Sequence, residues 1–388
     1  MRSSKIASAM GAVRRAKRPF REYGSDFLGV GCRGLASAVQ IGAMKRREFL
    51  QSLASVGLGL WGAGEGASAG PGTRRHRTRS PGSPSAPEGK PRVVIARHSG
   101  MMEANGRVNP EAVQQTVEEA VAAFGEAETA TEVWARYYRP TEVIGLKVNC
   151  LAGPHLSTRP AVAYAVARGL IRSGVPAARI IIWDRENREL RAAGYQIVTL
   201  RRALKCLGTD TPRVGYEEEL STQGSFAGRL SRILARFCTA QVNLPLIKDH
   251  GITGFTGALK NYLGAIHNPN RMHEGQGNPG IADLNCVPAL QRARRLIVGD
   301  ALTLQYEGGP SFDPRWNLLY NAILVASDPV AFDVIGWELI NEARRGANLR
   351  SLEAVGRTPT YITTAADAEH HLGTADRSEI EVIELTVG

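Results

Sequence analysis

The chain has 388 residues, which is long enough for two or three domains. Its formal net charge of +11 comes from the first part of the chain: residues 1–92 hold 17 Lys and Arg against 5 Asp and Glu, whereas residues 93–388 hold 31 against 32. Because the larger part is close to neutral, it lacks the basic surface that nucleic-acid binding requires. We therefore expect no nucleic-acid partner.

The first part of the chain carries the three parts of an export signal. Met44-Lys45-Arg46-Arg47-Glu48-Phe49-Leu50 resembles the twin-arginine motif, a short apolar stretch covers 53–63, and Ala67-Ser68-Ala69 is a small-residue cleavage site. The alternative is a chance amphipathic N-terminus. The apolar stretch is shorter than the about 20 residues of a membrane span, so we expect no stable span after cleavage.

These features divide the chain. Residues 1–43 precede a complete signal and are interpreted as a gene-model extension, and 44–69 as a signal peptide. We expect the twin-arginine translocation machinery as a partner and a periplasmic or exported location. Residues 70–91 are rich in Pro, Gly, Ser and Arg and are predicted to be a flexible linker, leaving 92–388 as the folded domain.

Short apolar runs alternate with helical patterns along that domain. We predict strands at 93–96, 143–148, 180–183, 240–246, 296–300, 322–326 and 381–387. We predict helices at 110–124, capped by Asn109, at about 160–171, and at 329–344. This alternation predicts an α/β fold with a largely parallel sheet flanked by helices, in which ligands bind at the C-terminal strand ends.

Polar side chains follow these apolar strands. They are Lys147 and Asn149, Asp184, Lys248 and His250, Asp300, and Asp328. If the strands are parallel, all of these side chains come to one edge of the sheet. Asp328 precedes Pro329, so a helix N-cap is its alternative role.

The window 248–268 is the most informative stretch, because it combines two lysines, two histidines and four glycines directly after an apolar strand. Lys248 and His250 are one residue apart and point the same way in an extended backbone. Lys260 and Asn261 are expected on a short helix that starts near Thr256. We predict that this window binds an anionic or metallic ligand; the alternative is a solvated surface.

We assign candidate roles on this basis. Lys248, His250, Lys260 and Asp184 are candidate catalytic residues, and His250, His267 and His273 are candidate metal ligands, since histidine is the commonest one. Each histidine has a structural alternative. The candidate cofactor-binding residues are Lys147, Asn149, Arg159, Asn261 and Asp328; Arg159 could hold a carboxylate or phosphate with two hydrogen bonds.

Cysteines give no sign of a metal cluster. Cys150, Cys206, Cys238 and Cys286 are widely spaced and form no C-x-x-C pair. We expect no cysteine-ligated iron–sulfur cluster, and buried apolar roles for these side chains, with a disulfide as the open alternative.

Several of these segments resemble the Domain of Unknown Function 362 family, over about Val93 to Ala331. The resemblance lies in Gly145-Leu146-Lys147-Val148-Asn149, the strand ending at Asp184, Val242-Asn243-Leu244-Pro245 with Lys248 and His250, Thr256-Gly257-Ala258-Leu259-Lys260-Asn261 with Gly264, and Ser327-Asp328-Pro329-Val330-Ala331. Some family members carry ferredoxin-type cysteine motifs, which this chain lacks. The family brings no established reaction.

Two shorter features are similar to lactate racemase-type proteins. They are Thr158-Arg159-Pro160 before a helix, and the ten-residue step from His250 to Lys260. This similarity implies that Lys260 anchors a nickel pincer nucleotide, that His250 ligates metal or moves protons, and that Arg159 binds a substrate carboxylate.

The sequence thus favours an exported protein that binds a metal or an anionic cofactor and catalyses an isomerase or redox reaction on a small carboxylate. The alternative is a non-catalytic periplasmic ligand-binding or maturation protein. The residues alone do not decide whether the protein is an enzyme.

Overall fold

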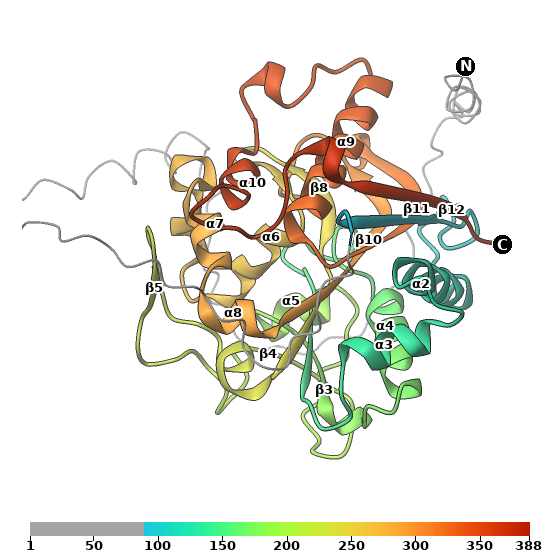
Figure 1. The fold of residues 1–388 in the computed structure, drawn as a ribbon, viewed down its shortest axis with the longest axis vertical. Coiled ribbons are helices and arrows are strands. Elements are labelled where there is room, and N and C mark those ends of the chain that lie inside the picture. The colour runs from blue at the N-terminus through green and yellow to red at the C-terminus, as the bar shows by residue number, and fades with distance from the viewer. Residues whose placement is uncertain (1–88) are drawn as a thin grey trace, which may run out of the picture. The chain divides into compact units, whose positions relative to one another are not determined.

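The computed structural model describes residues 89–388 (Figure 1). The predicted extension at 1–43, the signal peptide at 44–69 and nearly all of the predicted linker at 70–91 lie outside the described residues and stay predictions. Among helices within 89–388, none is long and apolar enough to cross a membrane.

A large mixed sheet organises the described part. Its strands are β1 (Arg92–Arg97), β2 (Ile144–Lys147), β3 (Ile180–Asp184), β4 (Lys205–Gly208), β7 (Ala240–Asn243), β8 (Leu246–His250), β9 (Gly254–Thr256), β10 (Arg294–Gln305), β11 (Asn317–Ala326) and β12 (Glu381–Thr386). The main order is β12-β1-β11-β10-β7-β2-β3-β4, with β8 paired to β10 and β9 to β8. Most neighbours are parallel, but β11 runs antiparallel to both β1 and β10. A separate hairpin joins β5 (Ser221–Gln223) to β6 (Phe226–Gly228).

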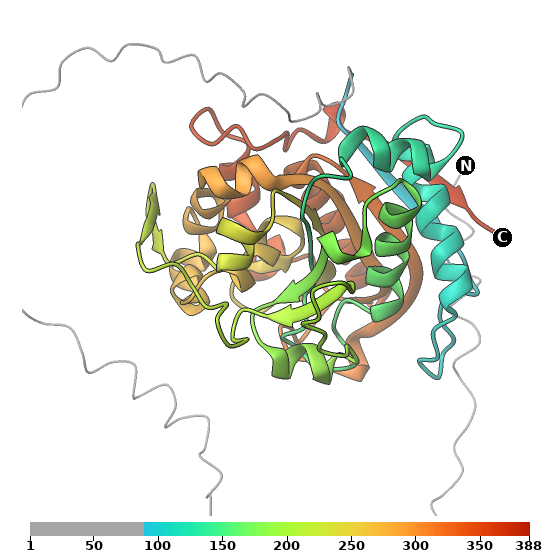
Figure 2. The same cartoon turned by 90° about the horizontal axis from the view of Figure 1, so that it is seen from below.

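Helices cover both faces of this sheet (Figures 1 and 2). On one face lie α2 (Pro110–Phe124), α3 (Ala130–Tyr137) and α4 (Pro160–Arg172). On the other lie α7 (Gly280–Asn285), α8 (Pro288–Ala293), α9 (Pro329–Gly346) and α10 (Thr360–Ala365). The remaining α-helices are the short α5 (Asn187–Ala192) and α6 (Ala258–Asn261).

Strand alternation explains the two cores. In β1, Val93 and Ile95 belong to the apolar cluster under α9, whereas Val94 and Ala96 belong to the cluster under α2. Successive side chains of a strand point to opposite faces, so a strand buried on both faces is a continuous apolar run. The predicted α/β class with a largely parallel, helix-flanked sheet is confirmed.

The predicted strand at 240–246 is two strands, because the chain turns at Leu244-Pro245. Proline has no N–H to donate to a sheet and is disfavoured inside a central strand. Strand β7 therefore ends at Asn243, and β8 continues beside the second half of β10. This step moves Lys248 and His250 beyond the end of β7.

The two strands at the centre of the sheet send their connections to opposite faces. From β2 the chain passes through α4 on one face, and from β7 it passes through α7 and α8 on the other. Strands β2 and β7 are neighbours. Such a switch point opens a crevice beyond the C-terminal strand ends, where ligands bind in open α/β sheets.

Candidate functional site

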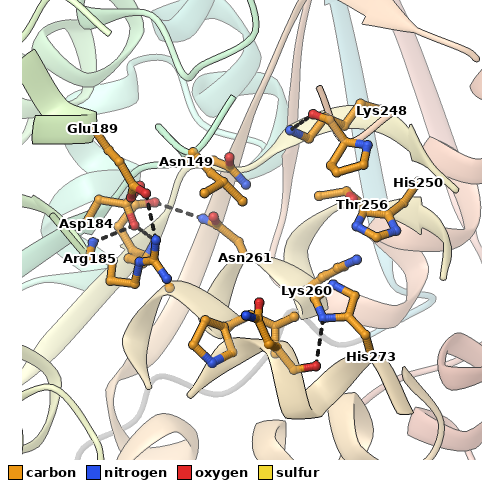
Figure 3. Close-up of a pocket in the computed structure, with 17 residues that line it drawn as sticks. Asn149, Asp184, Arg185, Glu189, Lys248, His250, Thr256, Lys260, Asn261 and His273 are labelled. Carbon is orange, nitrogen blue, oxygen red and sulfur yellow. Dashed lines mark hydrogen bonds and ion pairs between the residues drawn. The ribbon is translucent and has the colours of Figure 1, made fainter. Parts of the chain in front are cut away.

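A cavity of about 240 Å³ lies beyond the ends of β2 and β3 and beside β8 (Figure 3). Its wall combines charged, amide, imidazole and apolar side chains, and the lining residues are Lys147, Asn149, Leu151, Asp184, Arg185, Glu189, Lys248, His250, Thr256, Lys260, Asn261, Leu263, Gly264, Pro269, Asn270, His273 and Pro310. This volume suits a small ligand.

One wall is a buried ion pair at the ends of β2 and β3. Lys147 Nζ donates to Asp184 Oδ1 at 2.6 Å, and the backbone N–H of Cys150 donates to Asp184 Oδ2 at 2.7 Å. Gly264 lies against this pair: a Cβ there would be 2.7 Å from Asp184 Oδ1 and 2.8 Å from Lys147 Nζ. The wall thus depends on a close approach that only glycine permits.

Among the described residues, Lys248 and Lys260 are the two lysines of the cavity without a carboxylate partner, although both are buried. Lys248 Nζ has a long contact of 3.4 Å with Pro310 O, and Lys260 Nζ donates to Thr253 Oγ1 at 2.7 Å. Burial lowers the pKa of Lys248 to about 8. Burial, together with the charge of Lys248, lowers the pKa of Lys260 well below its ordinary value. At neutral pH, Lys248 is therefore mainly an ammonium, whereas the lowered pKa of Lys260 favours its neutral amine form.

The backbone fixes the tautomer of His250. The N–H groups of Ile252 and Thr253 both point at His250 Nδ1, at 3.2 and 3.3 Å. Because an N–H can only donate, Nδ1 must be the unprotonated nitrogen, and Nε2 carries the hydrogen. Burial and the nearby Lys260 lower the pKa of His250 to about 2, so the ring stays neutral and Nε2–H is a donor.

His273 has the opposite tautomer. Its Nδ1 lies 3.3 Å from Asn270 O, and since a carbonyl oxygen can only accept, Nδ1 carries the hydrogen. His273 Nε2 is then an acceptor. The two rings are stacked, with centroids 5.1 Å apart and planes inclined by 24°. The cavity therefore holds one imidazole donor beside one imidazole acceptor.

Acceptors without a partner lie in the same cavity. Asn149 Oδ1, Asn261 Oδ1 and Thr256 Oγ1 are buried and make no hydrogen bond in the described structure. The Asn261 amide group donates to Lys147 O and to Asn243 Oδ1, which orients its oxygen away from those groups. Buried polar atoms normally have partners, so these three atoms suit a ligand that donates.

On one side of the cavity the charged side chains form ion pairs with one another, and on the other side, among the described residues, they do not. Figure 3 shows Asp184, Arg185 and Glu189 on one side, where Arg185 pairs with Glu189 at 2.8 Å and Lys147 with Asp184. Lys248, His250, Lys260 and His273 lie on the other side. With His250 neutral, positive charge on that side comes from the lysines, and Lys248 is mainly protonated at neutral pH.

The three candidate metal ligands do not come together. His250 and His273 share the cavity, but His267 Nδ1 accepts from the Arg229 N–H, and its ring contacts Tyr216. Within residues 89–388, no group of three or more His, Cys, Asp or Glu side chains is arranged to hold a metal. A ligating histidine usually donates its other ring N–H to an acceptor, whereas His250 accepts there, so the geometry suits a hydrogen-bond donor.

Comparison with known proteins places the chain in a family. The sequence profile described as Domain of unknown function (DUF362) matches residues 144–338, about half of the chain. The chain belongs to the DUF362 family. Among solved structures, it is similar to a crystal structure of a protein from Thermotoga maritima, with 12% sequence identity and a TM-score of 0.33. That match covers 62% of this chain and 60% of the other. None of the curated proteins matches.

Within this DUF362 protein, eight of the residues predicted from sequence line the cavity. They are Lys147, Asn149, Asp184, Lys248, His250, Lys260 and Asn261, joined by His273. Lys248 and His250 face the same cavity from β8, as strand alternation predicts. Asp249 points away, to the Gly309 N–H and to Arg357.

Arg159 and Asp300 lie outside this set. The Arg159 guanidinium is buried and donates to Asp300 Oδ1 and Thr303 Oγ1. Strand β10 continues past Asp300 to Gln305, so Asp300 is not a strand end. The two residues satisfy each other, and Arg159 is not placed to bind a ligand carboxylate.

Asp328 is also outside the cavity, and the reason is topological. It follows β11, which is antiparallel to β10. Strand β11 therefore ends beside the start of β10, at the strand ends opposite to those that border the cavity. Asp328 caps α9 by accepting from the N–H groups of Val330 and Ala331. Its alternative role as an N-cap is the one that the structure has.

The sequence reasoning missed several lining residues. Arg185 follows Asp184 directly, Glu189 lies five residues after Asp184, and Asn270 lies three residues before His273, so proximity in sequence was an available signal for these three. No signal in the sequence pointed to Pro310. It lies in the connection between β10 and β11, and only the tertiary fold brings it into contact with Lys248.

Proposed function

We propose that this DUF362 protein binds a small carboxylate in the cavity, with Lys248 as the charged contact. The observation that carries the proposal is a buried lysine in a cavity without a carboxylate partner. Burying an unpaired ammonium is costly, and a bound anion offsets that cost. Hydrogen bonds to a charged group are also roughly twice as strong as neutral ones.

Charge favours a carboxylate over a phosphate or a metal ion. Lys248 is buried without a carboxylate partner among the described residues, and the neutral His250 adds a donor without adding charge. A singly charged anion balances this side of the cavity, whereas a divalent cation would face the Lys248 ammonium. The unpartnered oxygens of Asn149 and Asn261 suit a second, hydrogen-bond-donating group on the ligand.

We also infer export through the twin-arginine machinery, supported by Arg46-Arg47 and the apolar and small-residue stretches that follow. A folded domain with a preformed cavity is a suitable cargo. Catalysis of an isomerase or redox reaction on the bound carboxylate stays a proposal, and so does its alternative, ligand binding without turnover.

Calorimetric titration of the full chain tests carboxylate binding, with L-lactate, pyruvate and inorganic phosphate as probes. We expect a carboxylate to bind, and Lys248→Met to weaken it by roughly 10- to 100-fold, the value of a charge-assisted hydrogen bond. Lys90→Met, which removes an exposed lysine, is the control and should bind as the parent does. Binding of phosphate alone, or carboxylate binding that survives Lys248→Met, would refute the proposal.

A further inference from the structure

We propose that the Lys260 amine forms an imine with the ketone carbon of a small 2-oxo acid, while Lys248 holds the carboxylate of the same molecule. This inference rests on the proposed carboxylate binding and adds a covalent step to it. It assigns different tasks to two lysines that line one cavity of about 240 Å³. Chemically, the site would be one for carbonyl compounds rather than for anions in general.

Lys260 is placed to act as a nucleophile. Its Nζ donates to Thr253 Oγ1 at 2.7 Å, and that hydroxyl in turn donates to Phe255 O at 3.2 Å, so Thr253 receives one N–H and takes no proton away. A neutral amine held in this way keeps its lone pair for the cavity. Only the neutral form of lysine attacks a carbonyl, and burial beside a second cation favours that form.

The helix that carries Lys260 is held rigidly. Asp333 on α9 accepts from the N–H groups of Ala258 and Leu259, which begin α6. Asn261, the next residue, is bonded to Lys147 O and Asn243. The amine therefore projects from a fixed backbone, as positioning for reaction requires.

Lys248 and Lys260 differ in a way that fits the two ends of a 2-oxo acid. Among the described residues, Lys248 has no hydroxyl or carboxylate partner, and it remains mainly protonated at neutral pH, since its pKa is about 8. It provides the charge for the carboxylate. The adjacent ketone would then lie near Lys260, on the same side of the cavity (Figure 3).

The two histidines supply the proton transfers that imine formation needs. Figure 3 shows Lys260 beside His250 and His273. The Lys260 lone pair forms the N–C bond as the carbonyl π electrons move to oxygen, towards which His250 Nε2–H donates. His273 Nε2 takes the two protons that the nitrogen loses, one after the other, and passes each to the oxygen, which leaves as water. Amine and ketone give imine and water, so no oxidant, reductant or co-reactant is needed.

The test is reductive trapping on the full chain at neutral pH. The protein is incubated with pyruvate, treated with sodium borohydride, and examined by intact mass and peptide mapping. We expect one reduced pyruvate adduct per chain, located on Lys260. L-lactate, which has the carboxylate but no ketone, should give no adduct and should suppress trapping by competition.

Matched variants sharpen the result. Lys260→Met should abolish the adduct, Lys248→Met should require at least tenfold more pyruvate for the same yield, and Lys90→Met should trap as the parent does. Mapping the adduct on the parent does not depend on any variant folding. An adduct on Lys248, or spread over exposed lysines, would overturn the assignment.

The same experiment separates the two proposals. If pyruvate and L-lactate both bind by calorimetry but pyruvate leaves no adduct, the imine is refuted and carboxylate binding stands. If neither binds and nothing is trapped, both proposals fail.

Discussion

At the scale of single residues, the cavity keeps groups that cost stability. Lys248 is 2% exposed and has no ion-pair partner among the described residues, and His250 is held neutral by burial. Folded proteins avoid unpaired buried charges unless a ligand or a reaction uses them. The stability cost of Lys248 is therefore a measurable sign of its role.

We predict that Lys248→Met stabilises the ligand-free protein at pH 7 by roughly 3 kcal/mol, from about 1.4 kcal/mol per pKa unit. The lysine pKa is lowered to about 8 in the folded protein from 10.5. Between pH 8 and pH 10.5 the unfolded chain binds more protons than the folded protein. The free energy of unfolding of the parent therefore rises with pH over this range. The advantage of the variant is complete below pH 8 and disappears as the pH rises towards 10.5.

Denaturant unfolding of parent and variant at several pH values between 6.5 and 10 measures this difference. Lys90→Met should show no comparable trend, because Lys90 is exposed. If the difference in free energy of unfolding between parent and Lys248→Met did not change with pH, altered packing rather than the buried charge would explain it.

At the scale of elements, the site depends on how α6 is attached to the rest of the fold. This helix spans only Ala258–Asn261, which is too short to be stable alone. Its first two N–H groups donate to the two carboxyl oxygens of the buried Asp333 on α9, although burial raises the pKa of that group to about 8. A residue that lies outside the cavity lining therefore positions Lys260.

We predict that Asp333→Asn lowers stability by roughly 1–3 kcal/mol, because the amide keeps one acceptor and turns an NH2 towards a backbone N–H. Carboxylate binding and trapping at Lys260 should weaken with it. The measurements are denaturant unfolding and pyruvate trapping.

Asp376→Asn is the matched control, since Asp376 also accepts a backbone N–H but is exposed. It should change stability by less than about 0.5 kcal/mol. Equal effects of the two substitutions would show that Asp333 has no special part in positioning α6.

At the scale of the whole molecule, the sheet topology decides which strand ends meet. Strands β2, β3 and β7 are parallel and bring their ends to one edge, while the antiparallel β11 takes Asp328 to the other. The first and last strands of the domain, β1 and β12, lie side by side in parallel. The cavity lies beyond the ends of β2 and β3 and beside β8, next to the point between β2 and β7 where the connections change faces.

The proposed export concerns the entire chain, and its test is a paired substitution. We predict that Arg46→Lys with Arg47→Lys prevents export in the protein's own host, because the signal is read through its two arginines. Fractionation and immunoblotting measure the location. Arg74→Lys with Arg75→Lys, another adjacent pair beyond the signal, should be exported normally; loss of export in both double variants would refute the assignment.

The sequence by itself determined the fold class and much of the site's composition. Apolar runs alternating with helical patterns are local signals, and strand alternation placed Lys248 and His250 on one side. Helix α2 begins at Pro110 and ends at Phe124, with Asn109 as its cap, as these local signals predict. The roles of the candidate residues remain predictions.

Only the tertiary structure decided which polar strand ends share a cavity. The direction of β11, the break at Pro245 and the Arg159–Asp300 pair come from contacts between distant segments, which periodicity does not encode. The same holds for the two histidine tautomers and for the unpaired state of Lys248. These follow from which N–H, carbonyl or carboxylate the fold brings near each side chain, because protonation depends on surroundings rather than on residue type.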